Sequence, residues 1–169
     1  MPSQGQPKES TPVKMKKDPE GAFKWIVGKF RELQIPFQIT GGLAARSYGA
    51  TRELADIDFD VPEKHFAALA TALKEHIIFG PEHLKDDNWD LSLITLRYKG
   101  QDIDIGGAYE TNFFDREKRK WVPLVANLAT AQERELFGIK VPVVDRAELI
   151  EYKSKLARDV DKEDVRAIQ

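Results

Sequence analysis

The chain has 169 residues, of which 41% are hydrophobic and 32% charged, so it is long enough to bury a substantial apolar core. Its 26 Lys and Arg residues nearly balance 28 Asp and Glu residues, which excludes the global positive charge of many nucleic-acid-binding proteins. Cysteine is absent, which excludes disulfides and thiolate metal sites and suits a cytoplasmic protein. We also expect no secretion signal and no membrane span, because no apolar run approaches the ~20 residues that a transmembrane helix needs.

The N-terminal stretch, residues 1–17, is rich in Pro, Ser, Lys and Gln and has no periodic apolar residues, so it predicts an unstructured tail. A single ordered domain is expected over residues 18–169. Asp18 and Pro19 suit the start of a helix. Apolar side chains then follow at helical spacing up to the break at Pro36, namely Phe23, Ile26, Val27, Phe30 and Leu33.

The next segments alternate between strand and helix patterns. PFQIT predicts a strand that leads into Gly41 and Gly42, and LAARSYG predicts a short helix after them. ADIDFDV predicts a second strand, ended by Pro62. A second amphipathic helix is expected from Phe66, Leu69, Ala70, Leu73 and Ile77.

Two strands, LSLITLRY and QDIDIGG, are expected to form a hairpin around a tight turn at Lys99 and Gly100. The region from Tyr109 to Thr130 gives no clear pattern. FGIKVPVV predicts a hairpin or edge strand, and a helical segment begins near Asp145. This order of elements predicts an α+β fold with a mixed β-sheet flanked by helices.

Acidic residues alternate with apolar ones on two of these strands. In the first, Asp56, Asp58 and Asp60 share one face, and in the second, Asp102 and Asp104 do so. Carboxylates two residues apart on a strand stand about 6–7 Å apart. If the two strands are neighbours, three or more carboxylates converge, as a two-metal phosphoryl-transfer site requires. Oxygen ligands of this kind suit Mg²⁺ or Mn²⁺.

The glycine pair has a complementary role. Gly41 and Gly42 lie between a strand and a helix, so their backbone N–H groups could approach a triphosphate, aided by the dipole of the helix. The alternative is a purely structural tight turn.

Together, these motifs resemble the DNA polymerase β-type nucleotidyltransferase superfamily, above all its small single-domain members. Among those are lincosamide and aminoglycoside nucleotidyltransferases and the nucleotidyltransferase-like toxins of toxin–antitoxin pairs. The resemblance implies that Asp56 and Asp58 bind the metals and that Asp104 completes the catalytic set, with Asp102 as the rival for third place. It also implies a functional loop arginine, and Arg52 stands in that loop; the alternative is that Arg52 is a solvated loop residue.

The C-terminal stretch extends the resemblance. Small members of the family often end in a helix with Lys, Arg and spaced Asp residues, and this chain has Lys153, Arg158, Asp161 and Asp164 in corresponding places. By the resemblance, Lys153 contacts nucleotide phosphates. The alternative is that it lies on the solvated face of a terminal helix, where Lys155 is equally well placed by charge.

The implied function is transfer of a nucleoside monophosphate from an NTP, for example ATP, to an acceptor that the sequence does not identify: a small molecule, RNA or a protein. The charged run DREKRK with Trp121 could contact a polyanionic acceptor. The rival hypothesis is a catalytically silent binding or regulatory module, including a toxin–antitoxin component with a homodimer or antitoxin partner. A calcium loop starting at Asp56 is excluded, because its sixth and twelfth positions are Val61 and Ala67 rather than Gly and Glu.

Overall fold

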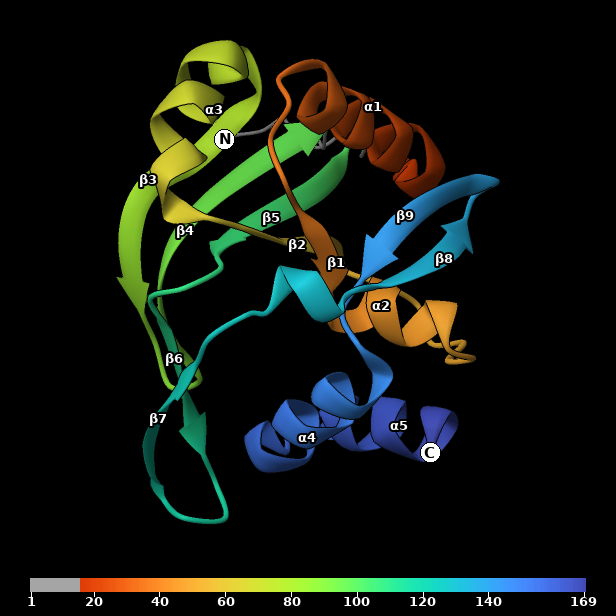
Figure 1. Ribbon diagram of the computed structural model, residues 1–169, viewed down its shortest axis with the longest axis vertical. Coiled ribbons are helices and arrows are strands. Elements are labelled where there is room, and N and C mark those ends of the chain that lie inside the picture. Colours follow the sequence, from red (N-terminus) through yellow and green to blue (C-terminus); the bar gives the residue numbers. More distant parts are fainter. Residues whose placement is uncertain (1–15) are drawn as a thin grey trace, which may run out of the picture.

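A mixed β-sheet forms the centre of the computed structural model, which describes residues 16–169 (Figure 1). Its strands run in the order β7-β6-β4-β5-β2-β1-β9-β8, and β3 pairs with β4 off this path. The strands are β1 (Gln38–Thr40), β2 (Asp56–Val61), β3 (Ile77–Lys85), β4 (Trp89–Tyr98), β5 (Gln101–Gly107), β6 (Thr111–Asp115), β7 (Lys120–Leu124), β8 (Gln132–Leu136) and β9 (Ile139–Val143).

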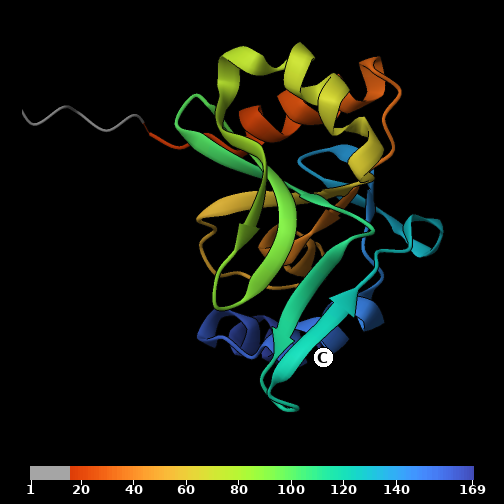
Figure 2. The same cartoon turned by 90° about the vertical axis from the view of Figure 1, so that its left-hand side faces the viewer.

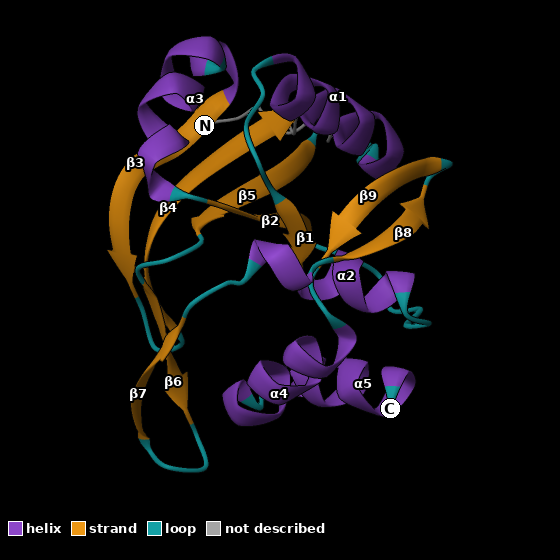
Figure 3. Ribbon diagram, in the orientation of Figure 1, coloured by secondary structure: helices purple, strands orange, loops and turns teal. Residues whose placement is uncertain are grey.

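Five α-helices flank the sheet within the described residues: α1 (Pro19–Glu32), α2 (Gly41–Ser47), α3 (Phe66–Ala72), α4 (Arg146–Leu156) and α5 (Asp159–Ile168). Figures 1 and 2 show α1 and α3 beyond one side of the sheet and α4 and α5 beyond the other. Figure 3 shows how α2 follows β1 directly. The predicted α+β class with a mixed sheet is therefore confirmed.

The alternation along β2 decides which of its faces carries chemistry. Ile57, Phe59 and Val61 are buried, and the Phe59 ring packs against α1, 6.3 Å from the ring of Phe23 and 5.3 Å from that of Phe30. Burying these side chains is the favourable term that fixes the strand's orientation. The aspartates between them consequently face the opposite side, toward α2 and α4.

The start of α1 follows the predicted signals, whereas its last residue, Glu32, lies four positions before the predicted break at Pro36. The Asp18 side chain accepts a hydrogen bond from the Gly21 N–H at 2.9 Å, and Pro19 occupies the first helical position. The tail expected at residues 1–17 lies outside the described residues except for its last two, so the predicted domain boundaries stay predictions. No helix between residues 16 and 169 combines the length and apolarity that crossing a membrane requires.

Three segments depart from expectation. The predicted second helix ends at Ala72, and Ile77 instead opens β3, because pairing with the long strand β4 outweighs helical spacing. The unassigned region Tyr109–Thr130 contains the β6–β7 hairpin and a 3₁₀ turn at Leu128–Thr130. The C-terminal helical segment is divided in two at Ala157, whose backbone is left-handed at φ 53°.

Candidate active site

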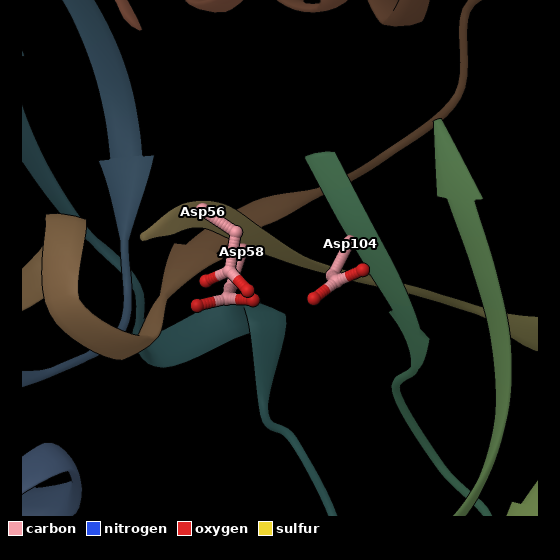
Figure 4. A group of neighbouring side chains, drawn as sticks. All are labelled: Asp56, Asp58 and Asp104. Carbon is pink, nitrogen blue, oxygen red and sulfur yellow. The ribbon is translucent and has the colours of Figure 1, made fainter. Parts of the chain in front are cut away.

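The parallel pairing of β2 with β5 brings three aspartates together. It sets Asp56 opposite Asp102 and Asp58 opposite Asp104. One carboxylate oxygen each from Asp56, Asp58 and Asp104 lies within 4.8 Å of the other two. Figure 4 shows Asp56 and Asp58 side by side on β2, with Asp104 facing them from β5. These three residues are called the acid triad below.

The rival third acid has a different partner. Asp102 accepts hydrogen bonds from the Arg97 guanidinium at 2.7 and 3.3 Å, and this ion pair lies at the surface. Asp104 instead accepts a hydrogen bond from the Thr95 hydroxyl at 2.7 Å, which orients its carboxylate within the triad. The geometry therefore groups Asp104, and not Asp102, with Asp56 and Asp58.

Two carboxylates of the triad, Asp58 and Asp104, have raised pKa values. Burial raises the pKa of Asp58 well above its ordinary value, repulsion by Asp56 and Asp104 adds to the rise, and Lys153 opposes it. Burial likewise raises the pKa of Asp104 to about 7, against the hydrogen bond from Thr95 and with further repulsion from Asp56. A divalent cation would remove this repulsion, and an all-carboxylate donor set fits Mg²⁺ or Mn²⁺.

The first glycine of the pair allows α2 to begin directly beside the triad. Gly41 has φ +64°, and a Cβ atom there would lie 2.4 Å from Oδ2 of Asp58. Its N–H donates to the Tyr152 hydroxyl at 3.1 Å, which also bonds the Thr40 hydroxyl at 3.0 Å. The expected strand-to-helix position is confirmed, whereas contact of Gly41 and Gly42 with a triphosphate stays a prediction.

Gly42 serves a different neighbour. A Cβ atom at this position would lie 2.7 Å from a guanidinium nitrogen of Arg52 and from Cδ2 of Leu54. The second glycine thus makes room for the arginine of the loop between α2 and β2.

Arg52 belongs to a chain of alternating charges, which we call the ion cluster: Arg52, Asp164, Lys153, Asp161 and Arg158. Arg52 donates to both carboxylate oxygens of Asp164, at 2.7 and 2.9 Å. The Lys153 ammonium lies 3.0 Å from Asp164 and 3.1 Å from Asp161. Arg158 donates to both oxygens of Asp161, at 2.7 and 3.1 Å.

The centre of the ion cluster is withdrawn from water. Lys153 is 1% exposed, and both aspartates are 0% exposed. Burial alone lowers the pKa of Lys153, but Tyr152, Asp161 and Asp164 raise it overall, so the ammonium stays charged. Lys155, the alternative basic residue, instead pairs with Glu151 at 3.3 Å on an exposed side of α4. The predicted phosphate contact of Lys153 stays a prediction.

The acid triad, the glycine pair and the three cations line one cavity of about 420 Å³. Apolar side chains of β3, β4 and residues 124–126 form a further part of its wall. A cavity of this size is in the range of small-ligand sites. A single cavity thus combines carboxylates that could bind a metal, positively charged side chains and an apolar surface.

Three polar residues of the site were not singled out from the sequence: Gln38 and Tyr152, which line the cavity, and Thr95, which donates a hydrogen bond to Asp104. The predicted turn at Lys99 and Gly100 already implies that Thr95 lies opposite Asp104, so simple counting along the hairpin could have found it. No comparable local signal exists for Tyr152, which reaches Gly41 across 111 positions of sequence.

Comparison with known proteins supports the same architecture. No family model and no curated protein sequence matches the chain. Among solved structures, a protein of Thermotoga maritima assigned as a nucleotidyltransferase superposes with a TM-score of 0.67 at 20% identity, over 86% of this chain and 89% of that one. The lincosamide antibiotic adenylyltransferase LnuA, bound to lincomycin, superposes with a TM-score of 0.60 at 15% identity, over 88% and 95%.

A third structure is ANT(2")-Ia in complex with adenylyl-2"-tobramycin, with a TM-score of 0.62 at 16% identity, over 88% of this chain and 86% of that one. The chain therefore has the nucleotidyltransferase fold, and the resemblance seen in the sequence is confirmed at the level of the fold.

Proposed function

We propose that the protein transfers a nucleoside monophosphate from an NTP to a hydroxyl of an acceptor and releases pyrophosphate. One observation carries the proposal: three carboxylates that form no salt bridge within residues 16–169 share a cavity with three cations, in a chain with the nucleotidyltransferase fold. A purely structural group of aspartates would be paired within the protein, as Asp161 and Asp164 are.

In this mechanism the acceptor oxygen attacks the α-phosphorus, and the bond from that phosphorus to the bridging oxygen of pyrophosphate breaks. Divalent metal held by Asp56, Asp58 and Asp104 would supply positive charge to the phosphate oxygens. Asp104 is the best-placed residue to take the acceptor proton, because Thr95 orients its carboxylate and burial raises its pKa to about 7.

The cations would neutralise the departing pyrophosphate. Arg52, Lys153 and Arg158 line the cavity, and the two aspartates of α5 fix their side chains in place. Pre-positioned charge of this kind stabilises a transition state without further reorganisation. Gly41 and Gly42 would leave room for the triphosphate next to Asp58. The Gly41 N–H would then donate to a phosphate oxygen in place of the Tyr152 hydroxyl.

The direct test is incubation of the protein with each of the four NTPs, Mg²⁺ or Mn²⁺ and a small-molecule cell extract. Pyrophosphate release is followed, and the product is identified as an NMP adduct by mass spectrometry. Metal-dependent adduct formation supports the proposal, with Asp58→Asn as the control that must lose it. If the wild type neither binds an NTP nor releases pyrophosphate with any extract, the alternative of a catalytically silent module gains.

A further inference from the structure

A polar pair, Gln38 and Asp60, lies in the same cavity next to the acid triad, because Asp60 follows Asp58 by two residues on β2. Gln38 of β1 stands opposite Asp60 of β2, and the Gln38 amide nitrogen donates to Oδ2 of Asp60 at 2.9 Å. Both residues line the cavity. The proposed mechanism does not use either of them.

The orientation of this amide is fixed by its partner. The NH₂ group of Gln38 must face the carboxylate, because the opposite orientation would set two acceptors against each other. The amide oxygen is thereby left over. This oxygen is buried, in a residue that is only 1% exposed, and it has no hydrogen-bond partner among residues 16–169. An unpaired buried acceptor of this kind costs about 1–3 kcal/mol, so a donor arriving from a ligand would be stabilised there.

The surroundings of the pair are apolar. Across the sheet, Asp60 faces Gly106 of β5, and Gly106 faces Leu93 of β4. Leu93, Leu91 and Trp89 alternate along β4 on the same face as Thr95 and line the cavity. The Asp60 end of the cavity is thus a polar pair set beside an apolar wall.

The in-line geometry of the proposed reaction places the acceptor at the Asp60 end of the cavity. β1 runs antiparallel to β2, so Gly41 and Gly42 continue from Thr40 toward Asp56, and Arg52 lies against Gly42. The ion cluster therefore marks the Asp56 end as the exit for pyrophosphate. Attacking and leaving oxygens lie roughly in line on a transferred phosphoryl group, so the acceptor enters from the Asp60 end.

We propose that Gln38 and Asp60 select the acceptor by binding one of its hydrogen-bond donors, while Leu93, Leu91 and Trp89 contact an apolar body. This inference rests on the proposed function. The acceptor class that it names is a small, mainly apolar molecule with a reacting hydroxyl and a hydroxyl or amine about 6–7 Å away, the spacing of alternate strand residues. A trans-1,4-disubstituted six-membered ring, which holds its two substituents at opposite ends, comes close to this spacing.

The test uses two probes of equal shape, trans-4-aminocyclohexanol and trans-4-methylcyclohexanol. Their dissociation constants are measured by NMR titration of the Gln38 side-chain amide and of backbone amides around the cavity. The wild type is expected to bind the amine at least tenfold more tightly than the methyl compound. Asp60→Asn keeps the shape and the Gln38 contact but should reduce this preference to less than threefold.

Glu148→Gln is the matched control, because Glu148 also lines the cavity and its carboxylate accepts instead from Thr130 at 2.7 Å. It should leave the preference intact. Gln38→Met provides a second variant, and a thermal melt of each variant checks folding. Equal binding of the two probes by the wild type, undetectable binding of both, or an equal loss in Glu148→Gln would overturn the proposal.

The NTP affinity of the same protein samples, measured with Mg²⁺, separates the acceptor-subsite hypothesis from the proposed nucleotidyl transfer. If NTP binds and pyrophosphate is released while the probes are not distinguished, only the acceptor subsite fails. If the amine is preferred but no NTP binds, the subsite stands as a ligand site and nucleotidyl transfer fails. Asp60→Asn should leave the NTP affinity within twofold of the wild type.

Discussion

Two groups of aspartates beside one cavity behave in opposite ways. In the acid triad, burial and mutual repulsion raise the pKa of Asp58 well above its ordinary value and that of Asp104 to about 7. In the ion cluster, burial also works to raise the pKa of Asp161, but Arg158 and Lys153 lower it overall. Carboxylates that the protein pairs with cations hold the fold and those cations, whereas the triad, which Lys153 compensates only in part, is available to an external cation.

The sharpest way to break this comparison is Asp58→Asn. We expect nucleotidyl transfer to fall by roughly 10²–10³-fold or more, the size of effect seen when a fixed electrostatic group is removed from an active site. The metal-free variant should nevertheless be as stable as the wild type or more so, since one repelling charge is gone and Phe59 still packs on α1. Steady-state kinetics and urea unfolding measure the two effects. An inactive variant that is also unfolded would mark Asp58 as structural.

An Asp→Asn substitution in the ion cluster should instead lower the stability of the protein. Asp164→Asn removes a charge shared by Arg52 and Lys153, both largely withdrawn from water. Leaving buried charge uncompensated costs about 3–5 kcal/mol, so the free energy of unfolding should drop by that order. Asp102→Asn is the matched control, because its pair with Arg97 lies at the surface and should change stability little. Equal effects of the two substitutions would remove the distinction between the groups.

The pH dependence of the metal-free protein tests the raised pKa directly. Between the unfolded pKa near 4 and a folded pKa of about 7, Asp104 holds a proton in the folded state that it lacks when unfolded. Stability should therefore decrease as pH rises through this window, by up to about 1.4 kcal/mol per pH unit for one group. Asp60, whose pKa burial raises to about 6, adds to the decrease at its lower end.

Urea unfolding in a chelator at pH 5, 6, 7 and 8 measures this slope, and Asp104→Asn should flatten it. Millimolar Mg²⁺ or Mn²⁺ at pH 8 should restore the lost stability, by about 2.7 kcal/mol at a hundredfold excess over the dissociation constant. A metal effect of the same size in Asp58→Asn would show that the cation binds elsewhere.

The sequence supports the acid triad better than the rest of the site because its signals are local. Period-two alternation places Asp56 and Asp58 on one strand face, and the tight turn at Lys99 sets Arg97 opposite Asp102. That same counting adds a second reason to favour Asp104, which the resemblance already named as the third acid. Local patterns of this kind survive folding because the apolar residues between the acids fix the strand's orientation.

The ion cluster and the Gln38–Asp60 pair depend on distant pairings that a local pattern does not encode. Arg52 meets Asp164 across 112 positions, and Gln38 meets Asp60 only because β1 and β2 are antiparallel neighbours. At Ile77 a local pattern is present but gives the wrong prediction. Its spacing is helical, yet its environment in the sheet makes it a strand residue.

The smallest expected effect concerns the glycine beside the triad, and it has an internal control. Gly41 and Gly138 both have positive φ, +64° and +79°, so alanine at either position costs about 1–2 kcal/mol in backbone strain. Around Gly138 a Cβ atom would meet nothing within 4 Å, whereas at Gly41 it would lie 2.4 Å from Oδ2 of Asp58. Gly41→Ala should therefore cost more stability than Gly138→Ala and, by displacing the Asp58 carboxylate, also reduce the metal-induced rise in melting temperature. Gly138→Ala should retain that rise in full. Equal metal effects in the two variants would mean that the position of the Asp58 carboxylate does not govern metal binding.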